Sequence, residues 1–204
     1  MENYVVTISR VFGSGGRTIG KMLSEKLSIP YYDKDIIKLA SEESGINEAL
    51  FGQVDEKLKN KFFSTVKAYN GQLATPDSPD FVSEENIFSY QAKIIKELAE
   101  KASPCIIIGR CADHILSDRK NVLKVFIWAD NDCCIQNAMD ICGYDRREAE
   151  KQVDKINRER AAYHKAHTGT DWMDVRNYDI CLNSSQLGFE KCLDIITHYI
   201  NIMK

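Results

Sequence analysis

Three glycines in four residues, Gly13, Gly15 and Gly16, form a turn near the start of the chain. Residues 4–9 before this turn are largely apolar and predict a buried strand, while residues 19–27 after it have the spacing of an amphipathic helix. Glycines let the backbone N–H groups of such a turn converge on an anion, and the start of a helix adds partial positive charge. The order of strand, glycine turn and helix therefore predicts a phosphate-binding loop. A turn that uses glycine only for tightness is the alternative.

The loop differs from the common pattern G-x-x-x-x-G-K-[ST], whose Lys contacts nucleotide phosphates and whose hydroxyl contacts magnesium. In one register Arg17 replaces the Lys and Thr18 keeps the hydroxyl; in the other, Gly16 takes the Lys position and Arg17 the Ser/Thr position. Arg can bind a phosphate through two parallel hydrogen bonds, so we expect Arg17 or Arg10 to replace the missing Lys. The residues expected to bind the nucleotide are Arg10, Gly13, Ser14, Gly15, Gly16, Arg17 and Thr18.

Five apolar segments along the chain predict strands, and helical patterns separate them. Most of these segments are continuous rather than alternating, as in strands that are buried on both faces of a parallel sheet. Strands that alternate with helices predict right-handed crossovers and a doubly wound α/β sheet. The predicted strands cover residues 4–9, 29–32, 105–108, 122–129 and 178–182.

Two stretches interrupt this alternation. Residues 41–82 hold a helical piece over 50–69 followed by a turn-rich loop, and they are too long for an ordinary connection. We therefore predict an inserted lobe over the site. Residues 145–171 are strongly polar and basic with few apolar positions, which favours a mobile lid over a core helix. A solvated helix face is the alternative for 146–160, because acidic residues interleave there at salt-bridge spacing.

Composition narrows the class of protein. The chain has 204 residues, 44% hydrophobic residues and a formal net charge of −3, which suits one soluble domain and argues against a general nucleic-acid binder. No apolar run approaches the roughly 20 residues that span a bilayer, and no signal-peptide pattern begins the chain, so we expect a cytoplasmic protein without membrane contact. The seven cysteines include no C-x-x-C pair, which favours buried free thiols over a metal site. His164 and His167 are expected to be surface residues, not metal ligands.

Five segments, taken in order, resemble the cytidylate kinase-like family, which is part of the nucleoside monophosphate kinase group of P-loop kinases. The resemblance covers nearly the whole chain, and the order and spacing of its segments carry it. These segments are residues 8–17, 29–37, 108–113, 158–163 and 177–183.

The resemblance implies a single P-loop kinase domain over residues 1–204. Its three-layer fold would have a five-stranded parallel sheet, an inserted acceptor-binding lobe (41–82) and an arginine-bearing lid (145–171). The implied reaction is ATP- and Mg²⁺-dependent phosphoryl transfer to a nucleoside monophosphate, such as CMP or dCMP. The resemblance also implies residue roles, namely acceptor binding by Asp33, Arg110 and Asp113, and catalysis by the lid arginines Arg158 and Arg160 beside Arg17.

Each implied role has a simpler alternative. Asp33 would serve only as a cap for the helix after it, and Arg110 would pair with a surface acid. For the whole protein, the alternatives are a P-loop kinase for another small acceptor and a nucleotide-binding sensor with little catalysis, which the missing Lys favours. The sequence gives no indication of the oligomeric state.

Overall fold

The computed structural model describes residues 3–56, 71–101 and 103–203. Within these ranges, five parallel strands form one sheet with the order β2-β3-β1-β4-β5. The strands are β1 (Val5–Arg10), β2 (Tyr31–Tyr32), β3 (Cys105–Ile108), β4 (Val122–Trp128) and β5 (Ile180–Asn183). The predicted five-stranded parallel sheet is therefore confirmed.

The central strand β1 is buried along its whole length, as its continuous apolar sequence predicts. Its first residue, Val5, lies opposite Cys105 of β3 on one side and Val122 of β4 on the other. The predicted strand over 29–32 is shorter in the structure, where β2 begins at Tyr31. Pro30 has no N–H to donate to a ladder, although its carbonyl still accepts a hydrogen bond from Ile106 N at 2.9 Å.

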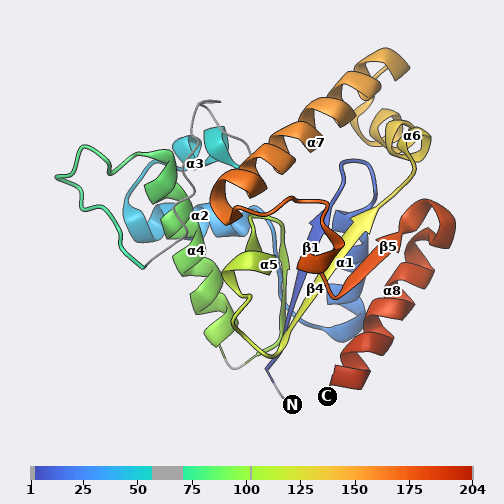
Figure 1. The fold of residues 1–204 in the computed structure, drawn as a ribbon, viewed down its shortest axis with the longest axis horizontal. Coiled ribbons are helices and arrows are strands. Elements are labelled where there is room, and N and C mark those ends of the chain that lie inside the picture. Colours follow the sequence, from blue (N-terminus) through green and yellow to red (C-terminus); the bar gives the residue numbers. More distant parts are fainter. Residues whose placement is uncertain (1–2, 57–70, 102, 204) are drawn as a thin grey trace.

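Helices cover both faces of the sheet (Figure 1). On one face lie α1 and α8, and on the other lie α2, α4 and the short α5, while α6 and α7 extend beyond the carboxyl ends of the strands. The helices are α1 (Gly16–Leu27), α2 (Asp35–Ser44), α3 (Glu48–Val54), α4 (Glu84–Glu100), α5 (Ala112–Ile115), α6 (Asn131–Cys142), α7 (Arg146–Thr168) and α8 (Ser184–Met203), with a 3-10 turn, η1 (Val175–Asn177).

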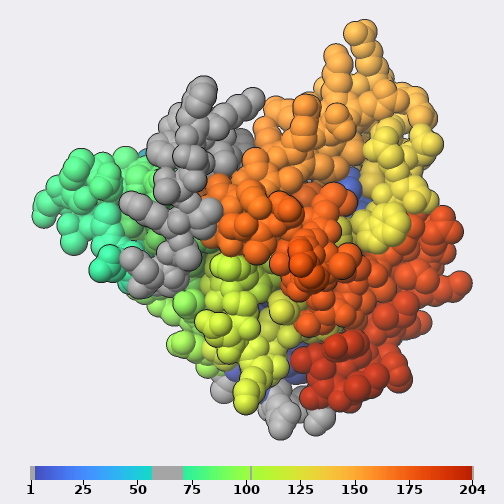
Figure 2. All heavy atoms as spheres, in the orientation of Figure 1, coloured from blue at the N-terminus to red at the C-terminus, as the bar shows by residue number. Residues whose placement is uncertain are grey.

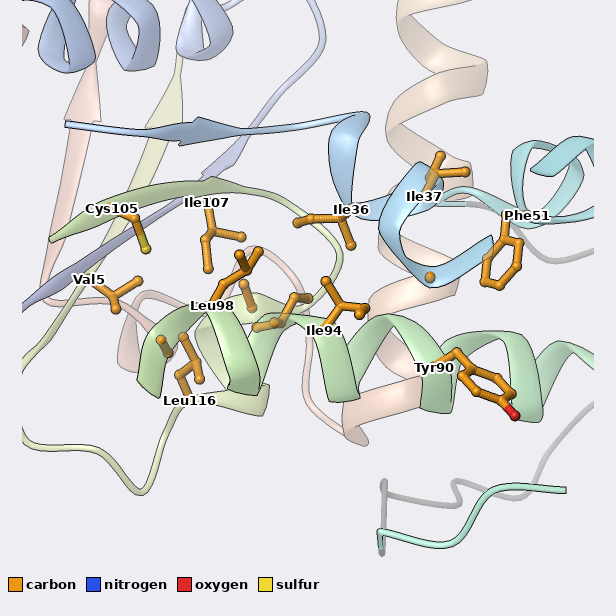
Figure 3. Packing of buried hydrophobic residues seen from close by; sticks show 14 of the residues in the cluster. Val5, Ile36, Ile37, Phe51, Tyr90, Ile94, Leu98, Cys105, Ile107 and Leu116 are labelled. Carbon is orange, nitrogen blue, oxygen red and sulfur yellow. The ribbon is translucent and has the colours of Figure 1, made fainter. Parts of the chain in front are cut away.

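Successive side chains of β1 and β3 enter different cores, because strand side chains alternate between the two faces of a sheet. Val5 and Ile107 belong to the core beneath α2 and α4, where Leu98 and Ile94 of α4 meet them (Figure 3). Ile8 and its neighbours on that side pack against α1 and α8 instead. Together these cores hold the carboxyl ends of β1 and β3 in place, and the charged side chains of the site lie at these ends.

The polar stretch 145–171 forms one helix of 23 residues, α7, which begins at a capping residue, Asp145. Its second half is packed into the molecule, with Arg160, His164 and His167 all buried. The expectation that the two histidines lie at the surface is therefore wrong. A hydrophobicity pattern could not reveal this, since the buried side chains are polar groups that have partners in the fold.

The predicted lobe, residues 41–82, contains the end of α2, the whole of α3 and the segment 71–82. Most of the predicted helical piece over 50–69 lies outside the described residues. Asn86 of α4 holds the segment 71–82, because its side chain accepts from Ala74 N at 2.8 Å and donates to Phe81 O at 2.7 Å. The last described residues before 57, Asp55 and Glu56, reach the carboxyl edge of the sheet.

Two expectations from composition can be compared with the described ranges. No helix in them combines the length and apolar character that crossing a bilayer requires. All seven cysteines lie in these ranges as free thiols. Cys133 is half-buried and Cys142 and Cys181 are exposed, so the expectation of buried thiols holds only for the other four.

Candidate active site

The glycine turn joins β1 to α1 and is packed too tightly for side chains at two positions. Gly13 and Gly15 have φ angles of +84° and +77°, in the left-handed region that favours glycine. A Cβ on Gly13 would overlap the backbone of Cys134 in α6, and one on Gly15 would overlap the ring of Phe189. Gly15 precedes the first turn of α1 without a side-chain cap, which leaves that turn's N–H groups directed out of the helix end.

Other residues hold the turn in place from behind. The Ser14 hydroxyl donates within 2.8 Å of Val11 O and 3.0 Å of Ile127 O, and the Ser14 carbonyl accepts from Ser184 Oγ at 2.7 Å. The fully buried Ser14 side chain thus braces the loop and does not face its open side. From α7, the Asn157 side chain accepts from Phe12 N at 2.8 Å.

A cleft of about 170 Å³ opens on the other side of the turn. The loop and the exposed side chains of Arg17 and Thr18 form one wall, and α6 forms the other with Asn137, Ile141 and Cys142. In Figure 2, atoms from the blue N-terminal part of the chain are visible in the hollow between orange α7 and yellow α6.

Four arginines from four separate parts of the chain converge at the carboxyl edge of the sheet. Arg10 ends β1, Arg17 lies in the first turn of α1, Arg110 follows β3, and Arg160 comes from α7. Arg110 is 1% exposed, Arg10 3% and Arg160 8%, whereas the Arg17 side chain is 45% exposed. Ligands of open α/β sheets bind at this edge, beyond the carboxyl ends of the strands.

Glu56 contacts three of these arginines. Its Oε1 accepts from Arg10 Nη1 and from the Arg110 main-chain N at 3.2 Å, and its Oε2 accepts from Arg160 Nε at 3.1 Å. Burial opposes ionisation of this carboxyl, but Arg10 and Arg160 outweigh it and hold the pKa of Glu56 well below its usual range. Glu56 is therefore a carboxylate at neutral pH.

Asp33 links two arginines across the site. Its carboxylate lies 2.8 Å from Arg17 Nε and 3.2 Å from Arg110 Nη1. The residue before α2 is Lys34, which makes no side-chain cap, so helix capping is not the role of the Asp33 carboxylate. Arg110 also pairs with Asp55 at 2.9 Å, and its own burial excludes the alternative of a surface ion pair.

Asp113 lies behind the arginines and connects α5 to α7. Its two carboxylate oxygens accept from Ser9 Oγ at 3.3 Å and contact His164 Nε2 at 3.2 Å. The His164 Nδ1 lies 3.1 Å from Thr168 Oγ1, which completes a buried polar chain. In this structure Asp113 thus anchors α7, the helix that carries Arg160, and it does not line the cavity around the arginines.

The two arginines expected from the lid differ in position. Arg160 reaches the end of β1, where its Nη1 donates to Arg10 O at 3.0 Å. Arg158 is exposed, and its Nε donates at 3.3 Å to Asp154 O on its own helix. The structure brings Arg160 to the other arginines and leaves Arg158 outside the group.

Sequence reasoning missed Glu56 and Asp55, and it placed Gly109 in the matching segment 108–113 without giving it a role. The only signal for the two acids is an Asp-Glu pair at the end of a short amphipathic segment in the inserted lobe, which is common on protein surfaces. Gly109 has a φ of +66°, and a Cβ there would overlap both Glu56 Oε1 and Arg10 Nη1. Its requirement for glycine depends on a contact between distant segments, which no local pattern contains.

The loop side of the site fits the phosphates of a nucleotide. The uncapped N–H groups at the start of α1 suit phosphate oxygens, and the exposed Thr18 hydroxyl suits a magnesium ion that phosphates and water also coordinate. Among the described residues, no group of three or more His, Cys, Asp or Glu side chains is arranged to hold a metal ion.

Comparisons with known structures agree with this fold. An uncharacterized protein from Eubacterium ventriosum is 27% identical, with a TM-score of 0.71 over 97% of this chain and 98% of that one. The shikimate kinase from Bacteroides thetaiotaomicron is 13% identical, with a TM-score of 0.55 over 97% of this chain and 98% of that chain. The shikimate kinase from Acinetobacter baumannii in complex with shikimate is 12% identical, with a TM-score of 0.53 over 98% and 94%. These similarities show the P-loop kinase fold.

A comparison with curated proteins found no match. The model of the cytidylate kinase-like family matches residues 5–186, which include the glycine loop, all four arginines and the whole sheet. The match covers most of the chain and confirms the resemblance that its motifs indicate. The chain belongs to the cytidylate kinase-like family.

Proposed function

We propose that this protein catalyses ATP-dependent transfer of a phosphoryl group to a nucleoside monophosphate, with CMP or dCMP as the acceptor. The observation that carries the proposal is the convergence of Arg10, Arg17, Arg110 and Arg160 beside the glycine loop. Phosphoryl transfer requires alignment of two substrates and positive charge around the transferring group, with little covalent chemistry by the protein. This arrangement of donors and charges meets that requirement.

In this proposal the loop and the start of α1 bind the donor phosphates. ATP would supply the transferable phosphoryl group, and Mg²⁺, when bound, would neutralise part of the phosphate charge, with the Thr18 hydroxyl as one of its ligands. Arg160 and Arg10 add positive charge beside the transferring group, where charge develops in the transition state. Their burial keeps water out and strengthens this interaction.

Arg10 is the better replacement for the missing Lys. A Cβ on Gly16 would lie 2.5 Å from Arg10 Cβ, so the absence of a side chain at residue 16 makes room for the Arg10 stem. The Arg10 guanidinium lies in the cavity among the other arginines, whereas the Arg17 guanidinium pairs with Asp33. Arg17 therefore connects the donor loop to the acceptor side, which we assign to Asp33 and Arg110.

The experiment is an assay of the purified protein with ATP, Mg²⁺ and a panel of nucleoside monophosphates, with products followed by mass spectrometry. We expect CDP or dCDP and an equal amount of ADP. Shikimate is tested beside the nucleoside monophosphates as a further acceptor, because solved shikimate kinases share this fold. Phosphorylated shikimate without any diphosphate would favour the alternative of another small acceptor. ATP binding without any product would contradict the kinase proposal and favour a nucleotide sensor.

A further inference from the structure

The Glu56 carboxylate is held the way proteins hold a phosphate group. Each of its oxygens accepts a hydrogen bond from an arginine, and a main-chain N–H adds a third donor. The donors come from the end of β1, the segment after β3, and α7, so that only the fold brings them together. Arginine side chains and main-chain N–H groups in this combination are typical of phosphate recognition.

The backbone beside Glu56 is shaped for close approach of an anion. Gly109, Arg110 and Cys111 have consecutive positive φ angles of 66°, 53° and 56°. For Arg110 and Cys111 such a conformation is strained, and strain of this kind is concentrated at functional sites. The missing side chain of Gly109 leaves the space in which Glu56 Oε1 meets the Arg10 guanidinium.

Glu56 does not use all the donors around it. Arg10 Nε and Nη2, and Arg110 Nε, are buried without a hydrogen-bond partner among the described residues. A carboxylate offers two oxygens, whereas a phosphate monoester offers three terminal oxygens and up to two negative charges. A phosphate group at this place can therefore satisfy donors that Glu56 leaves unpaired.

The balance of charge also favours a second negative charge. Arg10 and Arg160 share the single carboxylate of Glu56, while Arg110 has Asp33 and Asp55. Burial is the main cause that lowers the pKa of Arg160, to about 10, and the like charge of the neighbouring Arg10 adds to this effect. A ligand with two negative charges in place of Glu56 would balance the positive charges of both Arg10 and Arg160.

Glu56 is attached in a way that permits its release. It follows the C-cap residue of α3 and is itself left-handed, with a φ of 54°, which is unfavourable for a residue with a side chain. Its hold on the site therefore comes from the arginines and not from its own backbone.

We propose that Arg10, Arg160 and the main-chain N–H of Arg110 form a binding site for a phosphate group, which Glu56 occupies in this structure as an internal competitor. If the proposed function is correct, the phosphate group is that of the acceptor, the nucleoside monophosphate. Only this identification rests on the proposed function. Binding of phosphate itself requires no catalysis. Substrate and Glu56 compete for one site, so the Glu56 carboxylate leaves when the phosphate enters.

The test measures the affinity of the full-length protein for inorganic phosphate by isothermal titration calorimetry. Glu56→Gln removes the competing charge with almost no change in size, and we expect its Kd for phosphate to be at least about tenfold lower than that of the wild type, equivalent to roughly 1.4 kcal/mol. Glu48→Gln is the matched control, because it makes the same change at an exposed position of α3 and should leave the Kd unchanged. Adding Arg10→Ala to Glu56→Gln should abolish the gain.

An unchanged or higher Kd in Glu56→Gln would overturn the proposal, since it would mean that Glu56 holds the arginines in place for the ligand. If that variant does not fold, Glu56→Asp keeps the charge on a shorter stem that cannot reach both arginines. It should then bind phosphate more tightly than the wild type, and weaker binding would again overturn the proposal.

A second titration, with CMP in the presence of saturating phosphate, separates the two sources of the phosphate group. Competition supports the site for the nucleotide phosphate, and simultaneous binding contradicts that identification. Failure of the proposed function is distinguishable from failure of this inference. Tighter phosphate binding by Glu56→Gln without any kinase product would support the phosphate site and contradict the kinase function. Normal turnover by the wild type together with weaker phosphate binding by Glu56→Gln would support the kinase function and contradict the phosphate site.

Discussion

At the scale of single residues, the site depends on two glycines whose missing side chains leave room for Arg10. Gly16 stands where the Arg10 stem crosses the start of α1, and Gly109 stands where the Arg10 guanidinium meets Glu56. One buried arginine therefore passes two positions at which a methyl group would overlap it. This makes the geometry of Arg10 sensitive to the smallest possible substitution.

Gly16→Ala is predicted to displace Arg10 and to lower kcat at least about tenfold, because Arg10 supplies charge beside the transferring group. It should also lower the free energy of unfolding by about 1–3 kcal/mol through overpacking, although Ala is the better helix former. Steady-state kinetics and urea unfolding measure the two effects.

Gly52→Ala is the matched control, because a Cβ on this α3 residue meets nothing within 4 Å. It should leave kcat unchanged and raise stability by about 0.5–1 kcal/mol. An equal loss of kcat in both variants would mean that Gly16 has no special relation to Arg10.

At the scale of elements, α7 is the part of the molecule that hydrophobic periodicity describes least well. The strands over 105–108 and 122–129 follow apolar patterns, and the structure has them within one residue of the expected ends. In α7 the buried positions include Arg160 and His164, whose partners Glu56 and Asp113 are 104 and 51 residues away in the chain. The burial of such polar groups depends on tertiary contacts, so the sequence indicates a basic helix but not its inner face.

The same limit applies to the site itself. The glycine loop, Asp33 and Arg110 could be predicted, because each directly follows an apolar strand and the carboxyl ends of parallel strands share one edge. Glu56 lies in the inserted lobe, outside the alternation of strands and helices, and no spacing rule connects it to Arg10. The structure was needed to show that the arginines are already paired with carboxylates.

The two arginines of α7 give a prediction at this scale. Arg160→Ala should lower kcat by about 100-fold or more, the usual effect of removing one well-placed charge at a transition state, with a smaller change in KM. Arg158→Ala should change kcat less than about threefold, because its side chain is exposed and bonded to its own helix. Equal losses from both substitutions would show that α7 adopts another position during turnover, as the predicted lid would.

At the scale of the whole molecule, the buried polar contacts of α7 connect catalysis to folding stability. His164 contacts Asp113 beside the site, and His167, one turn further along, stacks on Phe88 of α4 with a ring separation of 3.9 Å. These contacts hold α7 to the rest of the fold from the side opposite its exposed face. Loss of either one would loosen the helix that delivers Arg160.

Burial, helped by the nearby His164, lowers the pKa of His167 to about 4, compared with 6.5 for a free histidine. Between these two values the unfolded chain takes up a proton that the folded protein does not, so the free energy of unfolding falls as the pH decreases through this window. From about pH 7.5 to about pH 4.5 the expected loss from this one residue is about 2–3 kcal/mol.

Urea unfolding of three proteins over this pH range isolates the effect from the carboxyl groups, which all three share. His167→Gln should lose about 2–3 kcal/mol less stability on acidification than the wild type. His198→Gln, at an exposed position of α8, should follow the wild type closely. If His167→Gln instead showed the wild-type dependence on pH, His167 would take up its proton over the same pH range in the folded protein as in the unfolded chain. The stacking on Phe88 would then be a cation–π contact that helps to hold α7 at low pH.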